Sequence, residues 1–352
     1  MRSIAIIMSA LPVIVLALGV ATSNPAQAQE VQGPKVNWKY NVWGKRRAFT
    51  EGVETMAGYL SDKTGGNFTI KIYYGEQLGG KKQNLDNLKA GVLDMAQICS
   101  SYHPGKNAAL TVLNLPFLPI KNPDVQASVH EAVYEHPVVK NEMASKWNSF
   151  ALMSSLLPQY EFLGKGEPPK TLEGFKGMSV RALGGLGDAM EKLGARKATL
   201  TATEVYQAID RGTMNAVSFP FTYAHAAYKI DEVASWFTTN LSPGTVDCPT
   251  LVSLGAWKKL PPQYQELVFA AKKPAYEALK AAYKKADDKN LPNFIAKMEA
   301  IEYSDEQLAH FREVGGAPVW RDWVAKHKSE FDAQGLLDHV MTTATRANQN
   351  LK

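Results

Sequence analysis

The sequence is poor in the residues that build catalytic, metal and redox sites. Its 352 residues include two cysteines and seven histidines. It has no His-Glu-x-x-His, Cys-x-x-Cys or Gly-x-Ser-x-Gly motif, so it offers neither a zinc site nor a nucleophile elbow. We therefore expect no enzyme, no cofactor, no metal site and no catalytic residue. We interpret His103 and His225, which lie near expected loops, as solvated side chains.

The two cysteines, Cys99 and Cys248, lie far apart in the sequence. Two cysteines cannot build a disulfide framework, and their spacing matches no metal motif. A disulfide between them is the alternative if the protein is exported. We favour two buried thiols.

Concentrated positive charge is also lacking. The net charge is +5, and no run of five or six Lys and Arg residues occurs. Nucleic-acid partners favour a concentrated basic face, so we expect no nucleic-acid partner.

Only the N-terminus has a long apolar run, from Ile4 to Ala21, preceded by Arg2. Small residues follow at Ala26 and Ala28, so residues 1–28 read as a signal peptide cleaved after Ala28. The alternative is an uncleaved membrane anchor, because the run is nearly long enough to span a bilayer. We favour cleavage, since Pro12 breaks the run. The mature chain is then exported, with no direct membrane insertion.

Strand and helix patterns alternate along the mature chain. Strands are expected at 35–44, 68–74 and 93–100, with helices at 49–60 and 85–91 between them. A second unit begins with the apolar run 150–157 and continues with a strand that ends at Arg181, a helix at 188–193, a helix capped by Thr203 and a strand at 214–219. This order predicts α/β units with parallel sheets flanked by helices.

From Pro261 the composition favours helices, with a kink expected at Pro274. Four aromatic residues of this region are expected in the core: Phe311, Trp320, Trp323 and Phe331.

Arg181 raises the main functional question. It stands in "GFKGMSVRALGG", Gly174 to Gly185, where a buried strand gives way to glycines. Arginine is seldom fully buried, but its planar fork matches a carboxylate, and α/β proteins bind ligands at the carboxyl ends of their strands. The alternative is a structural ion pair with a nearby acid. The "GGLGDA" stretch that follows lacks a phosphate-loop pattern, and we interpret it as a turn.

Several motifs occur in a fixed order: "GGNFTIKIYYGEQLGG", "LKAGVLDMAQ", "LPFL", "LEGFKGMSVRALG", "EVYQAIDRGTMNAV" and "AWKKLPPQYQELV". From about Val36 to at least Leu267 the chain closely resembles the solute receptors of TRAP transporters, the DctP-type periplasmic binding proteins. The resemblance implies a two-domain periplasmic binding protein fold with a ligand cleft between the domains and a long C-terminal spanning helix. We expect domain I at 29–157 plus about 249–285, and domain II at 158–248 plus about 286–352.

The resemblance also implies organic-acid ligands, closure by a hinge, and a partner of TRAP permease membrane subunits. The family's carboxylate-binding arginine falls at Arg181. The chain departs from the family pattern at three places: Phe219 stands where many members are polar, Val42 and Trp43 end the first strand, and 158–164 lacks the second arginine common there.

One cation among aromatic rings favours an aromatic or hydrophobic monocarboxylate. A receptor for a C4-dicarboxylate or sugar acid is the alternative, and an exported hydrolase or lyase is the alternative of another class. The expected ligand-binding residues are Arg181, Trp43, Tyr102, Tyr160, Phe219, Ser100 and Tyr223.

Overall fold

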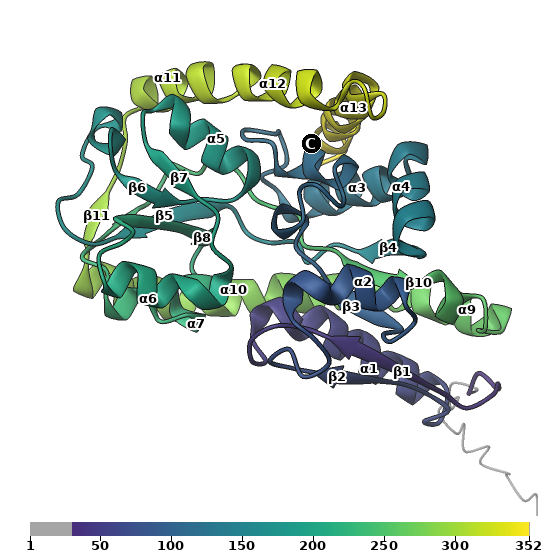
Figure 1. Cartoon of the computed structure of the whole chain (residues 1–352). Helices are drawn as coiled ribbons and strands as arrows, with labels where there is room; N and C mark the ends of the chain where they lie inside the picture. The colour runs from purple at the N-terminus through teal and green to yellow at the C-terminus, as the bar shows by residue number, and fades with distance from the viewer. Residues whose placement is uncertain (1–29, 352) are drawn as a thin grey trace, which may run out of the picture.

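The computed structural model describes residues 30–351, which form two β-sheets, each flanked by helices (Figure 1). The predicted signal peptide, residues 1–28, lies outside the described residues. Within residues 30–351, no helix combines the length and the apolar character needed to cross a membrane. The predicted α/β class with two sheets is confirmed.

The first sheet has the strand order β2-β1-β3-β10-β4. Its strands are β1 (Val36–Asn41), β2 (Phe68–Tyr73), β3 (Met95–Gln97), β4 (Ser149–Met153) and β10 (Thr250–Ser253). The predicted crossover helices are present as α1 (Glu51–Lys63) and α2 (Asn84–Lys89), and they make β1, β2 and β3 parallel. Strand β10 is antiparallel to β3 and β4, and the sequence pattern did not predict it.

The second sheet has the order β11-β9-β5-β8-β6-β7. Its strands are β5 (Tyr160–Gly164), β6 (Ser179–Arg181), β7 (Arg196–Ala198), β8 (Ala216–Pro220), β9 (Trp236–Thr238) and β11 (Glu299–Ile301). Strand β6 is parallel to β7 and β8, whereas β5 is antiparallel to β8 and β9. We call the first sheet with its helices the first lobe and the second sheet with its helices the second lobe.

The helices of the first lobe include α3 (Pro123–Glu135), α4 (Pro137–Trp147), α8 (Leu254–Trp257) and α9 (Pro262–Ala270). Those of the second lobe include α5 (Gly184–Lys192), α6 (Val205–Asp210) and α7 (Tyr223–Ala227). The C-terminal part contributes α10 (Lys272–Lys297), α11 (Asp305–Gly315), α12 (Ala317–His327) and α13 (Ala333–Gln349).

Two local predictions are wrong. The "GGLGDA" stretch is the first part of helix α5 and not a turn. Thr201, and not Thr203, begins the next helical segment, because Thr201 and Glu204 form a capping box. Pro274 lies in the first turn of α10, and the helical run expected to kink there is interrupted at Ala271, between α9 and α10.

The lobes are joined by several crossings of the chain. Segment 154–159 leads from β4 to β5, and segment 239–249 returns from β9 to β10. These two segments are bonded to each other: Ser242 Oγ donates to Gln159 Oε1 at 3.2 Å, and Thr245 Oγ1 donates to Leu157 O at 3.0 Å. Helix α10 runs along one side of both lobes, and α11 and α12 run along the opposite side (Figure 1).

Helix α13 returns to the first lobe, where Leu336, Val340 and Ala344 share a buried cluster with residues of α3. Of the aromatic residues expected in the core, Phe311 and Trp323 are buried, and Trp320 and Phe331 are partly buried against the core. The assignment of residues to domains I and II stays a prediction.

Candidate ligand-binding site

A small cavity of about 30 Å³ lies between the two lobes. The first lobe contributes the loops after β1 and β3, and the second lobe contributes the ends of β6 and β8 and helix α7. The cavity is lined by Trp43, Arg47, Phe49, Cys99, Tyr102, Leu157, Tyr160, Arg181, Leu183, Ala202, Phe219, Pro220, Tyr223, Ala224, Tyr228 and Cys248.

Arg181 is completely buried at the end of β6. Its Nε donates to Leu200 O at 3.0 Å and its Nη1 donates to Ser218 O at 2.7 Å. Its Nη2 is buried and has no hydrogen-bond partner in the described part of the chain. No carboxylate of residues 30–351 forms an ion pair with Arg181, so a structural salt bridge does not account for it.

Two backbone carbonyls therefore fix the guanidinium, and the ring of Phe219 lies 4.5 Å from its Cζ. A buried charge is costly unless an opposite charge pairs with it. The free Nη2 edge at the cavity is suited to a ligand carboxylate, which would supply that missing charge.

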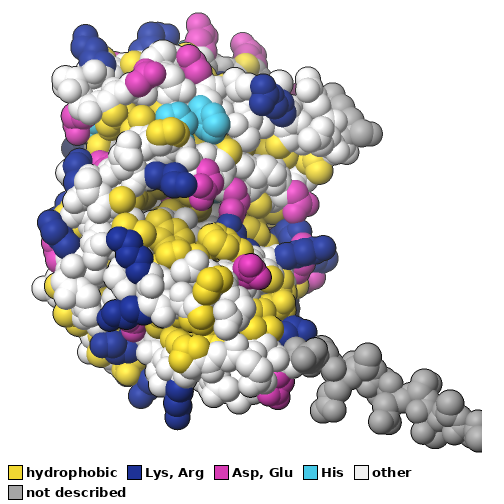
Figure 2. All heavy atoms as spheres, turned by 90° about the vertical axis from the view of Figure 1, so that its right-hand side faces the viewer, with side chains coloured by type: hydrophobic (Ala, Val, Ile, Leu, Met, Phe, Trp, Pro, Cys, Tyr) yellow, Lys and Arg dark blue, Asp and Glu magenta, His cyan; other side chains and the backbone are white. Residues whose placement is uncertain are grey.

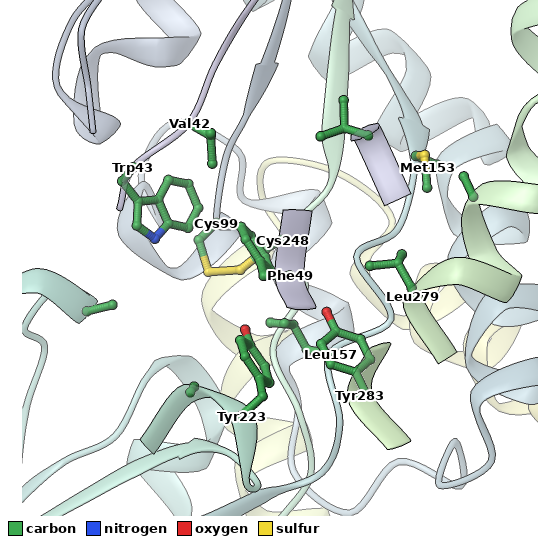
Figure 3. Packing of buried hydrophobic residues seen from close by; sticks show 14 of the residues in the cluster. Val42, Trp43, Phe49, Cys99, Met153, Leu157, Tyr223, Cys248, Leu279 and Tyr283 are labelled. Carbon is green, nitrogen blue, oxygen red and sulfur yellow. A yellow bond between two sulfur atoms is a disulfide. The ribbon is translucent and has the colours of Figure 1, made fainter. Parts of the chain in front are cut away.

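The structure brings most of the predicted residues together. Trp43, Tyr102, Tyr160, Phe219 and Tyr223 all line the cavity with Arg181. Figure 3 shows Trp43 and Tyr223 close to the cavity's disulfide.

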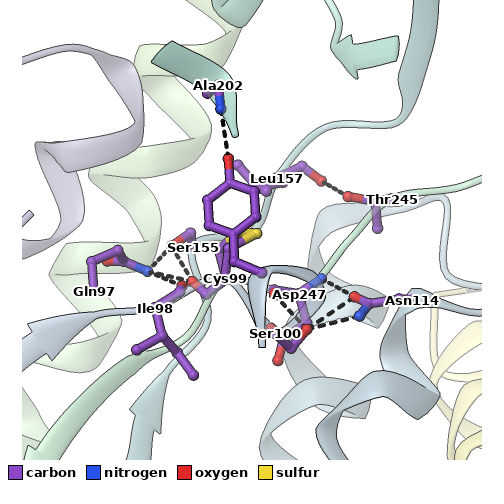
Figure 4. The surroundings of a disulfide bond; sticks show 12 residues. Gln97, Ile98, Cys99, Ser100, Asn114, Ser155, Leu157, Ala202, Thr245 and Asp247 are labelled. Carbon is purple, nitrogen blue, oxygen red and sulfur yellow. Dashed lines mark hydrogen bonds between the residues drawn. A yellow bond between two sulfur atoms is a disulfide. The ribbon is translucent and has the colours of Figure 1, made fainter. Parts of the chain in front are cut away.

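Ser100 is different, because it does not line the cavity. Its Oγ donates to Asp247 O at 2.8 Å and accepts from Asn114 Nδ2 at 2.8 Å, so it supports the wall from behind (Figure 4).

The tyrosines of the cavity are neutral phenols. Burial raises the pKa of Tyr102, of Tyr160 and of Tyr223 above the ordinary value. Tyr102 Oη of the first lobe accepts a hydrogen bond from Ala202 N of the second lobe at 2.9 Å (Figure 4). This bond joins the lobes directly beside the cavity.

Cys99 and Cys248 form a disulfide in the cavity wall, so the preference for two free thiols is wrong. The reason is the register of β3 and β10, in which Gln97 faces Thr250. Two residues further along, Cys99 and Cys248 stand opposite each other (Figure 3). Since the sequence pattern did not predict β10, this neighbourhood was not visible from the sequence.

Arg47 is the main residue that sequence reasoning missed, and the expectation of a single cation is wrong. It lies in the loop after β1 and lines the cavity. The available signal was "GKRR", Gly44 to Arg47, directly after the strand, but the predicted site residues of this region ended at Trp43. Phe49, Leu157 and Tyr228 were missed as well.

His103 and His225 are buried and not solvated, which corrects the prediction. Burial lowers the pKa of His225 to about 3 and the pKa of His103 to about 4. Neither residue lines the cavity. In residues 30–351 no group of three His, Cys, Asp or Glu side chains is placed to hold a metal ion.

Two α/β lobes around a shared cavity are the architecture of a solute-binding protein. The sequence profile of bacterial extracellular solute-binding protein, family 7 (DctP), matches residues 41–327, and the chain belongs to this family. A monocarboxylate 2-oxoacid-binding periplasmic protein of Nostoc sp. is 26% identical over 279 residues, which covers 78% of this chain and 75% of the relative.

Solved structures show the same fold. A TRAP solute-binding protein from Rhodoferax ferrireducens T118, in complex with copurified benzoate, has a TM-score of 0.78 at 18% identity and covers 90% of this chain and 100% of that chain. A TRAP periplasmic solute-binding protein from Sulfitobacter sp. with bound β-D-galacturonate has a TM-score of 0.73 at 19% identity, with coverages of 88% and 100%.

The resemblance to TRAP solute receptors is thereby confirmed. Members of this family are solute-binding proteins and not enzymes, so the hydrolase or lyase alternative is set aside.

Proposed function

We propose that this chain is the periplasmic receptor of a TRAP transporter and that it binds an aromatic or hydrophobic monocarboxylate through Arg181. The observation that carries the proposal is the free Nη2 of a fully buried arginine in a cavity lined by aromatic rings. Cleavage after Ala28 would release the receptor into the periplasm. There it would deliver the acid to the membrane permease subunits.

A receptor for a C4-dicarboxylate or sugar acid is the second candidate, because Arg47 gives the cavity a second guanidinium. The aromatic lining favours the first candidate. Stacking on aromatic walls adds about 0.5–1.5 kcal/mol beyond the burial of area.

Titration calorimetry with benzoate, phenylpyruvate, succinate and galacturonate tests the proposal. We expect the aromatic acids to bind at least about tenfold more tightly than succinate, since tenfold corresponds to about 1.4 kcal/mol. Displacement of bound benzoate by an equal concentration of succinate would contradict the aromatic preference.

The same assay tests the carboxylate clamp. Arg181→Lys keeps the charge but loses the fork, so affinity for the aromatic acids should fall by about tenfold or more. Arg196→Lys, on the exposed strand β7 of the same sheet, is the matched control. If both variants bind like wild type, Arg181 is not the clamp.

A further inference from the structure

We propose that Arg47 binds a second oxygen of the ligand, so that the solute is an aromatic carboxylate with a hydroxyl group on its ring. This inference rests on the proposed function, in which Arg181 holds the carboxylate. It adds a specificity-determining residue from the opposite lobe.

Arg47 is held in place and yet has a free edge. Its Nη1 donates to Trp43 O at 2.9 Å and to Lys45 O at 2.7 Å. Its Nε is buried and has no hydrogen-bond partner among residues 30–351. The neighbouring Arg46 behaves differently, because its Nε and Nη2 donate to the two carboxylate oxygens of Glu51 at 2.9 and 3.0 Å.

A stack of rings connects the two arginines of the cavity. The Cζ of Arg47 lies 5.7 Å from the centre of the Tyr228 ring. Tyr228 is stacked on Phe219, with ring centres 5.3 Å apart and planes 17° apart. The Cζ of Arg181 lies 4.5 Å from the centre of the Phe219 ring. The wall therefore presents two stacked aromatic rings with a guanidinium near each end, which suits an aromatic ligand with polar groups at both ends.

A second unpartnered group stands beside Arg47. Tyr228 Oη is buried without a hydrogen-bond partner in the described chain, and burial raises the pKa of Tyr228, so its phenol is neutral. A Cβ built on Gly44 would lie 3.0 Å from Arg47 Nη1 and 3.4 Å from Tyr228 Oη, which places both side chains at one corner of the cavity.

Leaving buried donors without partners costs free energy. A ligand hydroxyl pairs with both groups, because its oxygen accepts from Arg47 Nε–H while its proton is donated to the oxygen of Tyr228. The glycine at position 44 leaves the corner open for these two side chains.

Calorimetry with benzoate, the three hydroxybenzoate isomers and isophthalate tests the inference in wild type, Arg47→Met and Arg46→Met. At least one hydroxybenzoate should bind wild type about tenfold more tightly than benzoate does, the gain expected for one hydrogen bond to a charged group. Arg46→Met should keep this gain. Arg47→Met should lose it, so that hydroxybenzoate binds this variant no more tightly than benzoate does, and measurable binding of benzoate shows that the cavity is still formed.

Four outcomes would overturn the inference. If benzoate binds wild type but no hydroxybenzoate isomer binds more tightly, Arg47 does not bind a second oxygen of the ligand. The proposed function then stands. An equal loss of benzoate and hydroxybenzoate in Arg47→Met would make Arg47 a support of the wall only. If isophthalate binds more tightly than every hydroxybenzoate, the second polar group of the ligand is a carboxylate and not a hydroxyl. If no acid of the panel binds wild type, both this inference and the proposed function fail.

Discussion

At the scale of single residues, the second lobe has a carboxylate whose protonation is tied to folding. Glu161 on β5 is buried next to Tyr160 of the cavity, and Ser242 N donates to its Oε1 at 3.0 Å while Thr238 Oγ1 donates to its Oε2 at 2.5 Å. Burial outweighs these bonds and raises the pKa of Glu161 to about 7. The folded protein therefore holds this proton to higher pH than the unfolded chain does.

We expect Glu161 to make folding less stable as the pH rises from about 4.5 to about 7. Between these values the folded state binds more protons than the unfolded state, so the free energy of unfolding falls with rising pH, by on the order of 1–3 kcal/mol. Glu161→Gln removes the titration and keeps a similar shape. Urea unfolding at pH 5, 6, 7 and 8 measures the difference between wild type and variant.

The difference between wild type and variant isolates Glu161, because the contributions of His103 and His225 are the same in both proteins. These histidines act with the opposite sign. Their pKa values are lowered in the fold, so their contribution is lost as the pH falls below their unfolded pKa. Both histidines are present in wild type and variant. A difference in unfolding free energy that does not change with pH would contradict the raised pKa of Glu161.

At the scale of elements, sequence patterns predicted the strands that follow a simple alternation with helices. Strands β1, β2, β3, β6 and β8 were anticipated, because each is apolar, bounded by turn residues and linked to a neighbouring helix. Strands β5 and β10 were missed, because antiparallel partners far along the chain select them. No local pattern records such a pairing.

The candidate site shows the same division. Arg181 and five aromatic residues could be predicted, since they lie at ends of recognisable strands or match a family pattern. Arg47 could not be placed, because a loop sets its direction by bonding Nη1 to Trp43 O and Lys45 O. The disulfide was not predicted, because its prediction requires the pairing of β3 with β10, and β10 was missed.

We expect the disulfide to stabilise the pairing of β3 with β10. Cys99 and Cys248 are separated by 149 residues, so their bond constrains a long loop of the unfolded chain. Losing it should lower the free energy of unfolding by about 2–4 kcal/mol. Urea unfolding of the double variant Cys99→Ala, Cys248→Ala measures this loss.

Wild type unfolded in a thiol reductant is the companion experiment. It should approach the stability of the double variant, and the double variant itself should not respond to the reductant. Equal stability of oxidised wild type and double variant would argue that the bond adds nothing to this fold.

At the scale of the whole molecule, the two lobes meet around the cavity. Their contact includes Tyr102 Oη with Ala202 N, and also the start of α5 against the loop that contains Asn114 and Pro116. The outer surface has a different character. On the face in Figure 2, basic side chains are scattered among acidic and uncharged ones. The cavity itself is lined by two arginines, Arg47 and Arg181.

Gly185 lets the lobes approach closely, and this leads to a prediction about closure. A Cβ at this position would lie 2.7 Å from Asn114 O and 2.8 Å from Pro116 Cδ, atoms of the first lobe. Alanine is the better helix former, so Gly185→Ala should favour helix α5 itself. We nevertheless expect it to hold the lobes apart and to weaken binding of the preferred aromatic acid by about tenfold or more, although residue 185 does not line the cavity.

Calorimetry measures the affinity, and small-angle scattering measures whether excess ligand still makes the molecule more compact. Gly58→Ala in helix α1 is the matched control, because a Cβ there meets no atom within 4 Å. The control should bind and compact like wild type, whereas Gly185→Ala should stay more extended at the same ligand concentration. Wild-type affinity and compaction in Gly185→Ala would mean that the first lobe yields at Asn114 and Pro116, and that the close approach does not limit closure.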